Sequence, residues 1–442
     1  MKFNKWTMGL AAIGVVSLAS AARADETATK MDKVNTALSN TTLSGYVDVG
    51  AEFNPGGVGY SDNYYYSAQP NGYPGSRGYN GGPGYYAFAK ANGFYLNSVD
   101  LALDKPQDES PWASGYHVEL MFGPDATPNS STGSYSTTAI RQAYIALRTP
   151  VGNTAIDWKV GVFDTIIGYE STTDGANPNY TRSYGYTMEP TSHTGILGTF
   201  KATDWISFSA GIADTTFNQS AINAGTSAGA MYYPTTMGVV ALTAPDSWGW
   251  AKGATFNIGA INTPGTYNGS GGGTSFYAGA TVPTPLTALK VGASFDYLDI
   301  HNSPYNTQTG YNNSPNPAND SIWDVALYAS YQFNDKLSLN LRGEYLNQQN
   351  VGGDSYYGYS YSGIVPYVQG SYYYYNGYNN TSAPNVEAVT ATLQYALWAN
   401  VLSRVEFRWD HAEHGTPFAY ASNGEYGTAN AFTLALNLIY QF

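Results

Sequence analysis

The chain has 442 residues, a formal charge of −13 and no cysteine. The missing cysteines exclude a disulfide framework, thiolate metal sites and a cysteine nucleophile. The acidic balance argues against nucleic acid as a partner, because nucleic-acid-binding proteins need a basic face for the phosphates. Charged residues make up only 12% of the chain, about half of the roughly 25% found in soluble globular proteins. This composition is unusual for a soluble protein.

Residues 1–24 have the three parts of a secretory signal peptide. Lys2 and Lys5 form a positively charged start, residues 8–18 form an apolar core, and residues 22–24 read Ala-Arg-Ala, an A-x-A cleavage pattern. The apolar core is shorter than the ~20 residues that a membrane-spanning helix needs. The sequence therefore predicts export with a cleaved signal.

Residues 25–41 have the apolar spacing of a helix, with Met31, Val34 and Leu38 on one side. We expect a short periplasmic N-terminal segment with helical structure. A plug of the pore or a contact between subunits is the alternative role for this segment.

From residue 42 to residue 442 the apolar residues recur with a period of two. Such alternation places apolar side chains on one face of a strand and polar ones on the other. The last segment is the clearest case, since every second residue from Phe432 to Phe442 is apolar. Each segment is near the ~9–11 residues that a tilted strand needs to cross a bilayer. The predicted strands are 43–53, 94–104, 114–123, 138–148, 154–163, 191–200, 205–214, 234–244, 254–262, 274–282, 289–300, 321–333, 337–347, 385–397, 402–411 and 429–442.

The connections between these segments alternate long and short along the chain, as 54–93 against 149–153 illustrates. A transmembrane barrel sorts its loops in this way, with short periplasmic turns and long extracellular loops. The sheet must close on itself, because lipid offers no hydrogen bonds to a strand edge. We therefore predict an all-β fold over residues 42–442, a transmembrane, antiparallel, up-and-down β-barrel of about 16 strands, or about 14 or 18 if the weakest segments are misassigned. Those weakest segments are 191–200, 234–244 and 254–262.

Two features of the chain resemble a known family. The C-terminal strand ends in phenylalanine after alternating apolar residues, which resembles the signal that outer-membrane porins of Gram-negative-type bacteria present to the barrel-assembly machinery. The stretches KVGVFDTIIGYE (159–170) and SHTGILG (192–198) resemble the putative β-barrel porin family 2 (OmpL-like). The resemblance implies an outer-membrane location, a porin function and that assembly partner. The tyrosine-rich loops depart from the family pattern.

Charged residues in the predicted strands fall mostly on the polar face, which in a barrel of about 16 strands lines an aqueous lumen. A lysine or arginine on the lipid face would cost about 2–4 kcal/mol at the bilayer midplane. Arg141, Asp299 and Glu387 fall on the lipid face at extracellular strand ends, where this cost fades. The predicted pore-lining residues are Asp48, Glu52, Asp100, His117, Glu119, Asp157, Lys159, Lys290, Asp296, Asp324, Arg342, Glu344, Arg404, Glu406, Arg408 and Asp410.

Arg342, Arg404 and Arg408 gather on two predicted strands, and several carboxylates gather on the first three strands. One interpretation is a basic wall opposite an acidic wall, which would give a transverse field across the pore. The other is neutralisation between neighbouring strands, which the alternating signs of residues 404–410 favour. The sequence leaves both interpretations open.

The connection 164–190 is the candidate constriction, because the resemblance to general porins implies that the third long loop folds inward. We expect its carboxylates to favour cations in a narrow passage. A loop that stays outside the pore is the alternative. The candidate constriction residues are Asp164, Glu170, Asp174, Arg182 and Glu189.

The connections 54–93 and 348–384 are rich in tyrosine, of which the chain has 41. Tyrosine supplies rigid amphipathic contact area, as binding loops exploit. These loops could bind sugars or a neighbouring surface protein. Loops that pack on each other and cap the barrel mouth are the other interpretation.

No catalytic or cofactor motif stands out. The run 410–414 (Asp-His-Ala-Glu-His) lacks the helix that would place its histidines on one face as metal ligands. The sequence contains no G-x-S-x-G, phosphate-loop or H-E-x-x-H motif. We predict no enzyme activity, no cofactor and no metal site.

Taken together, these patterns predict a porin in the bacterial outer membrane that lets small hydrophilic solutes or ions diffuse passively through a water-filled lumen. The expected partners are membrane lipid, the barrel-assembly machinery and small hydrophilic solutes. A homo-oligomer, for example a trimer, is possible, but the sequence does not fix the number of subunits. The alternative is a surface-exposed structural or adhesion barrel whose pore is occluded and whose tyrosine-rich loops make the contacts.

Overall fold

The computed structural model describes residues 41–53, 93–126, 138–214, 234–264, 272–301, 320–348, 385–414 and 429–442. The predicted signal peptide, nearly all of the segment 25–41, and the tyrosine-rich stretches 54–92 and 349–384 lie outside the described residues. Statements about those parts of the chain stay predictions.

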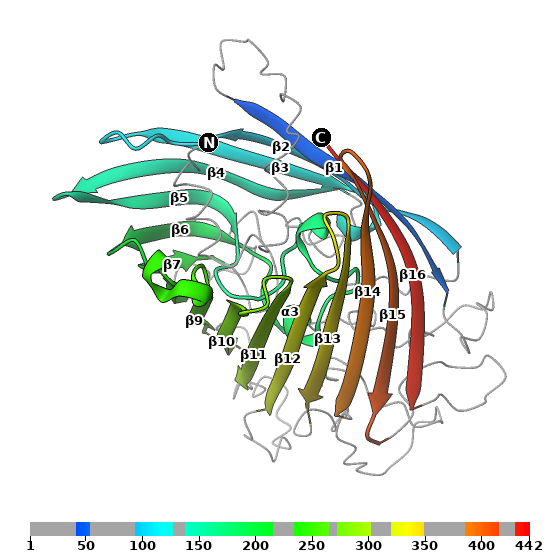
Figure 1. The fold of residues 1–442 in the computed structure, drawn as a ribbon. Coiled ribbons are helices and arrows are strands. Elements are labelled where there is room, and N and C mark those ends of the chain that lie inside the picture. Colours follow the sequence, from blue (N-terminus) through cyan, green and yellow to red (C-terminus); the bar gives the residue numbers. More distant parts are fainter. Residues whose placement is uncertain are drawn as a thin grey trace.

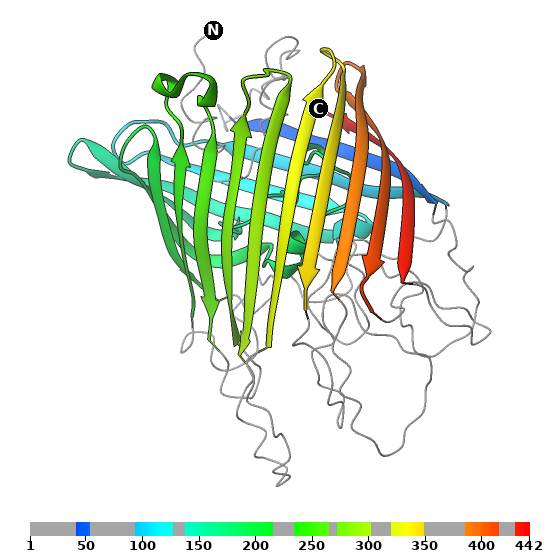
Figure 2. The same ribbon diagram turned by 60° about the horizontal axis from the view of Figure 1, so that its bottom comes forward.

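The described strands form one closed antiparallel barrel, in which each strand pairs with its sequence neighbours and β1 pairs with β16 (Figures 1 and 2). The predicted fold class and the sixteen strands are confirmed. The strands are β1 (Thr42–Phe53), β2 (Gly93–Lys105), β3 (Ser114–Phe122), β4 (Thr138–Val151), β5 (Thr154–Asp164), β6 (Ser192–Lys201), β7 (Ile206–Ala213), β8 (Thr235–Thr243), β9 (Thr255–Thr263), β10 (Gly272–Pro283), β11 (Leu289–His301), β12 (Asp320–Gln332), β13 (Leu337–Asn347), β14 (Val386–Trp398), β15 (Val401–Ala412) and β16 (Asn430–Gln441).

Helical structure among the described residues is short: η1 (Pro124–Ala126), η2 (Asp174–Ala176), α3 (Tyr184–Met188) and η3 (Asp246–Ala251). In this part of the chain, the helices are all too short or too polar to cross a membrane.

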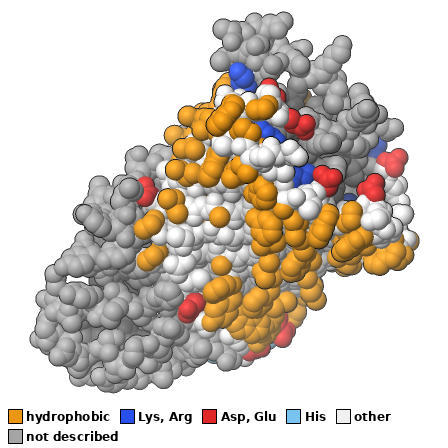
Figure 3. Space-filling view, turned by 90° about the vertical axis from the view of Figure 1, so that its left-hand side faces the viewer, with side chains coloured by type: hydrophobic (Ala, Val, Ile, Leu, Met, Phe, Trp, Pro, Cys, Tyr) orange, Lys and Arg blue, Asp and Glu red, His pale blue; other side chains and the backbone are white. Residues whose placement is uncertain are grey.

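The alternation of side chains explains the barrel. In β16, Leu434, Leu436 and Leu438 point outward and are exposed, whereas Ala435 and Ile439 point inward and are buried. On the face shown in Figure 3, apolar side chains gather in broad patches and charged side chains lie toward the margins. An exposed apolar belt of this kind suits a surface that faces lipid.

The barrel closes at a seam between β1 and β16, whose register runs from Tyr46 opposite Gln441 to Phe53 opposite Leu434. At one end of this seam, Phe442 pairs with the beginning of β1. Gly45 and Phe442 exchange two backbone hydrogen bonds, with N–O distances of 3.1 Å and 3.0 Å. The last residue of the chain is therefore built into the ring of strands.

One predicted orientation is wrong. Arg141 was expected on the lipid face, but its side chain is buried inside the barrel and forms ion pairs with Asp164 (2.8 Å) and Glu119 (3.3 Å). A register shift between β3 and β4 is the cause, because Glu119 pairs with Gln142 and the next residue pairs with Ile140. This β-bulge leaves Arg141 as the extra residue and re-aims its side chain.

Candidate functional site: the lumen and the loop inside it

Residues 165–191, here called the inner loop, connect β5 to β6 and lie inside the ring of strands together with α3 (Figures 1 and 2). Local contacts fix the shape of this loop. Thr165 donates a backbone hydrogen bond to Thr191 at its base (3.1 Å). The side chain of Asn177 accepts from the amide of Ser171 and donates to its carbonyl, both at 2.7 Å. The inner loop is thus a folded element with its own turns.

The helix α3 within this loop begins at a capping residue, since the hydroxyl of Ser183 accepts a hydrogen bond from the amide of Tyr186 (3.1 Å). Tyr184 and Met188 of α3 pack on inward apolar side chains near the long-loop ends of several strands. At the start of the loop, Ile166 and Ile167 pack on a second apolar patch. The first patch comprises Leu298, Ile322, Leu346, Val386, Ala388 and Ala412, and the second includes Leu197, Met237, Val239, Ile261 and Tyr277. The lumen wall therefore provides one apolar patch for each part of the loop; these two patches are here called the apolar seats.

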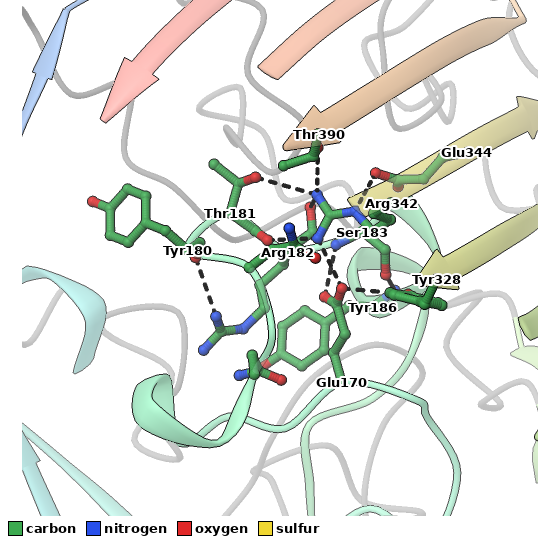
Figure 4. A network of polar contacts seen from close by, with 12 residues as sticks. Glu170, Tyr180, Thr181, Arg182, Ser183, Tyr186, Tyr328, Arg342, Glu344 and Thr390 are labelled. Atoms are coloured by element: carbon green, nitrogen blue, oxygen red, sulfur yellow. Dashed lines mark hydrogen bonds and ion pairs between the residues drawn. The ribbon is translucent and has the colours of Figure 1, made fainter. Parts of the chain in front are cut away.

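Three arginines of the barrel wall bind the backbone of the inner loop. The guanidinium of Arg342 on β13 donates to the carbonyls of Thr181 (2.6 Å) and Arg182 (3.0 Å) (Figure 4). Arg408 on β15 donates to the same carbonyl of Arg182 (2.7 Å). Arg404 on β15 donates to the carbonyls of Asp174 (3.1 Å) and Asn177 (2.5 Å). These wall arginines are almost fully buried, so they serve the loop and do not face open solvent.

Carboxylates of the wall hold the amides of the same loop. Glu406 accepts from the backbone of Tyr180 (2.6 Å) and of Thr181 (2.9 Å). Glu344 accepts from the backbone of Tyr184 (2.7 Å), and Glu52 on β1 accepts from the hydroxyl of Tyr180 (2.8 Å). A loop buried inside a barrel needs partners for its backbone groups, and charged wall residues supply them.

Most of the predicted constriction residues are in ion pairs. Asp164 pairs with Arg141 and Glu170 with Arg342, each at 2.8 Å. Asp174 and Arg182 pair with each other, also at 2.8 Å. The structure brings these residues into the lumen, but the electric field of each carboxylate is offset by a neighbouring guanidinium.

Glu189 is the exception. Its side chain is hydrogen-bonded to Asp296 on β11, and Asp324 on β12 lies close by. Burial, together with the carboxyl of Asp296, raises the pKa of Glu189 well above its usual value. Both oxygens of Asp324 lack a hydrogen-bond partner among the described residues. Gly185 of α3 packs directly on the carboxylates of Asp296 and Asp324, where a Cβ atom would collide with them.

The predicted pore-lining residues divide into two groups. Those buried under the inner loop or against one another are Asp48, Glu52, Asp100, Glu119, Asp296, Asp324, Arg342, Glu344, Arg404, Glu406, Arg408 and Asp410. Those only partly buried are His117, Asp157, Lys159 and Lys290. A role of either group in lining an open pore stays a prediction.

The partly exposed charges concentrate on the inner face of β2–β5, here called the uncovered wall. Its charged residues are Asp104, His117, Arg148, Asp157 and Lys159. The side chain of Asp104 is 41% exposed and that of Asp157 is 30% exposed. The carboxylate of Asp104 lies 3.1 Å from Nδ1 of His117, and Arg148 forms an ion pair with Asp157 at 3.2 Å.

Sequence reasoning missed two members of this wall and the seats of the inner loop. Asp104 and Arg148 lie at the periplasmic strand ends. Each comes four residues after an inward-facing residue, Asp100 or Tyr144, so strand alternation predicts that each also faces inward. The seats could have been noticed as apolar residues on a face that is otherwise polar, such as Leu298. The bulge that turns Arg141 inward has no signal in the sequence.

The predicted opposition of a basic wall to an acidic wall does not describe the arginines of β15. Ring closure places β15 next to β16, and β16 next to β1. Arg404 and Arg408 on β15 therefore lie two strands from the carboxylates of β1, not across the lumen from them, whereas Arg342 on β13 lies four strands away. Neutralisation between neighbours, the second interpretation, fits ion pairs such as Arg408 with Asp410 (2.8 Å).

The run 410–414 is divided by the strand alternation. Asp410 points inward to Arg408, whereas the imidazole of His411 contacts Asn430 on the neighbouring strand (3.0 Å). Within the described ranges, no group of three or more histidine, cysteine or acidic side chains has the geometry to hold a metal ion.

Comparison with known proteins gives one family and a set of similar folds. A family model described as "Putative beta-barrel porin-2, OmpL-like" matches residues 40–442. No curated protein sequence matches the chain.

Three solved structures illustrate the similar folds. The outer membrane channel DcaP of Acinetobacter baumannii has 13% identity and a TM-score of 0.52, with 91% of this chain and 97% of that chain covered. OmpF of Salmonella typhi in complex with daunomycin has 12% identity and a TM-score of 0.52, at 91% and 97% coverage. The trimer form of OmpT from Vibrio cholerae has 11% identity and a TM-score of 0.51, at 91% and 99% coverage. At such identities the likeness concerns the fold.

Proposed function

The chain belongs to the putative β-barrel porin family 2 (OmpL-like) and is a porin of the bacterial outer membrane, and from this premise we propose a route for its solutes. Small hydrophilic solutes diffuse passively through the water-filled lumen. Their route runs between the inner loop and the uncovered wall of β2–β5. The observation that carries this proposal is the concentration of partly exposed charged side chains on the inner face of β2–β5.

Burial supports this route. Charged wall residues that contact the inner loop, such as Arg342 and Glu406, are 1% exposed. Asp104 and Asp157 on the uncovered wall keep 41% and 30% of their side-chain surface accessible. Water and solutes can therefore reach the second set, whereas the first set is sealed by the loop.

We further propose a preference for cations. Ten of the predicted pore-lining residues are carboxylates, against five lysines and arginines. Most of these carboxylates are covered, but their charge still contributes to the electrostatic potential in the lumen. Charge around a pore selects ions of the opposite sign. Ion pairs within the inner loop reduce its own contribution, so the preference is expected to be weak.

Passive diffusion needs no covalent chemistry, and we propose that the protein has no enzyme activity. The exposed apolar belt would contact membrane lipid. The strand ending in Phe442 would be read by the barrel-assembly machinery. The trimeric OmpT of similar fold supports a homo-oligomer, with a trimer as the first candidate.

Single-channel conductance in planar bilayers, with a KCl gradient, tests the proposal. Stable steps with a cation-shifted reversal potential are expected. An anion-shifted reversal would reject the cation preference and keep the pore. Absence of conductance from protein that is folded and inserted would reject the open route and favour an occluded structural or adhesion barrel.

A thiol-labelling experiment locates the route. The chain has no cysteine, so a single introduced cysteine is the only reactive thiol. Asp157→Cys on the uncovered wall should react with a charged methanethiosulfonate reagent and change the conductance. Thr390→Cys is the matched control, because Thr390 is fully buried beside Arg342 on the covered side. Equal reaction at both positions would reject the proposed route.

A further inference from the structure

Lys159 differs from the other cationic side chains of the lumen. It lies midway along β5, on the uncovered wall. Arg342, Arg404 and Arg408 are sealed under the inner loop. Lys290, the other partly buried lysine among the predicted pore-lining residues, is the second residue of β11 and so lies near one end of the strand. Among the lysines and arginines of the described lumen, Lys159 is therefore the one that combines central depth with partial exposure.

In the described part of the chain, the arginines near Lys159 are in ion pairs, whereas Lys159 is not, so its charge can act on a solute. Arg141 is taken by Asp164 and Glu119, and Arg148 by Asp157. Among the ion pairs of the described residues none includes Lys159, although Asp164, Asp104 and Glu119 interact with its ammonium at longer range. The ammonium lies over the ring of Tyr144, with Nζ 4.7 Å from the ring centroid.

An aromatic row fixes the position of this ammonium. The ring of Tyr144 on β4 stacks on the imidazole of His117 on β3, with centroids 5.3 Å apart and an angle of 21°. Lys159 on β5 extends the row by its cation–π contact. Contact with an aromatic face positions a cation without neutralising it, because the ring carries no net charge. A solute in the passage would thus meet a localised positive charge.

We propose that Lys159 is a selectivity-determining residue of this porin. It opposes the cation preference of an otherwise acidic lumen and lets solutes with an anionic group pass the centre of the barrel. This inference rests on the proposed route along β2–β5. Zwitterionic solutes and those with a carboxylate or phosphate are the class that it would favour, relative to the same pore without the lysine.

The test is the ratio of K⁺ to Cl⁻ permeability, measured as the reversal potential in a KCl gradient. Lys159→Gln should raise the ratio about threefold, as expected for a unit charge several ångströms from a permeating ion in screened water. Lys159→Glu should raise it further, and Lys159→Arg should leave it unchanged. Lys252→Gln is the matched control, since Lys252 sits in an exposed turn and pairs with Asp246.

A chemical rescue keeps the test decisive if Lys159→Glu fails to fold. Lys159→Cys should show the raised ratio, and reaction with a positively charged aminoethyl thiosulfonate should restore the wild-type value. A negatively charged reagent should raise the ratio again. Unchanged ratios in all conducting variants would overturn the role of Lys159 and leave the porin function intact. Absence of conductance in folded, inserted wild-type protein would instead overturn the proposed function on which this inference rests.

Discussion

The covered and the uncovered walls of the lumen use the same kinds of residue for different purposes. On the covered wall, Arg342 and Glu406 hold the backbone of the inner loop and are 1% exposed. On the uncovered wall, Arg148 and Asp157 pair with each other and stay in contact with solvent. A charged residue on the inner face of a barrel is therefore not by itself a residue of the pore.

The energetic consequence is a strong contrast between the two walls. Removing one partner of a buried ion pair costs about 3–5 kcal/mol, because it leaves the other charge buried and unpaired. Removing one partner of an exposed pair costs about 0–1 kcal/mol. Substitutions on each wall should reveal this difference.

The largest effect is expected for Arg342→Ala. This change removes two hydrogen bonds to the loop backbone, leaves Glu170 without its guanidinium, and leaves Glu344 with only the longer contact to Arg408 (3.7 Å). The free energy that docks the inner loop on the barrel wall should become less favourable by about 3–5 kcal/mol. Trypsin then provides the measurement, because Arg182 becomes cleavable when the loop is released. Cleavage after Arg182, followed by mass spectrometry, should accelerate more than about 100-fold.

A result that contradicts this prediction would be full protection of Arg182 in folded Arg342→Ala protein. Such protection would mean that the apolar seats hold the loop without the arginines.

Tyr184→Ala should have the next largest effect. Tyr184 is fully buried in its apolar seat, and its hydroxyl donates to Asp410 (2.9 Å). Truncation of a buried aromatic side chain costs about 3–5 kcal/mol, with the lower end expected because the loop can shift. Tyr184→Phe keeps the packing and should cost about 1 kcal/mol. Guanidinium unfolding of the two variants measures the difference, and equal midpoints would show that the ring packing contributes nothing.

The carboxyl cluster under α3 should make the hold on the loop pH-dependent. Because the folded-state pKa of Glu189 is raised, protonated Glu189 contributes fully to the stability of the docked loop below its unfolded-state pKa of about 4.3. This stabilising contribution is lost as the pH rises through the folded-state pKa of Glu189. Above that pH the charge of Glu189 faces the carboxylates of Asp296, Asp324 and Glu170, and the loop should open more often.

Glu189→Gln removes this titration and is expected to flatten the pH dependence. Trypsin cleavage after Arg182, normalised at each pH to an unfolded peptide, measures it between neutral and alkaline pH. Identical profiles for wild type and Glu189→Gln would show that another group controls the loop.

The smallest effect is expected on the uncovered wall. Arg148→Ala breaks the partly exposed pair with Asp157 and should change the unfolding free energy by about 0–1 kcal/mol. Protection of Arg182 should be unaffected. A loss as large as that of Arg342→Ala would erase the distinction between the two walls.

The fold could be predicted from the sequence because a period of two and sorted loops are local patterns. Each predicted strand agrees with a strand of the barrel, and the main difference is the extension of β4 to Val151. Even the segments blurred by Gly and Thr, such as 254–262, form strands, because pairing with neighbours on both sides supports weak alternation.

The site was less accessible to prediction, because its contacts join distant parts of the chain. Glu170 and Arg342 are 172 positions apart, and nothing in either local sequence indicates their pairing. The ring closure that places β15 near β1 also depends on the whole chain. Parity correctly placed the charges on the inner face but could not show which of them the inner loop would cover.

The seam between Gly45 and Phe442 has a consequence for biogenesis. Among the described strands, β16 follows all the others in the sequence, and its neighbour Phe442 forms two of the closing hydrogen bonds with Gly45. A chain truncated by even a few residues would leave β1 with unpaired backbone groups at the edge of an open sheet, which lipid cannot accommodate. Closure therefore ties the stability of β1 in the membrane to the presence of β16 beside it.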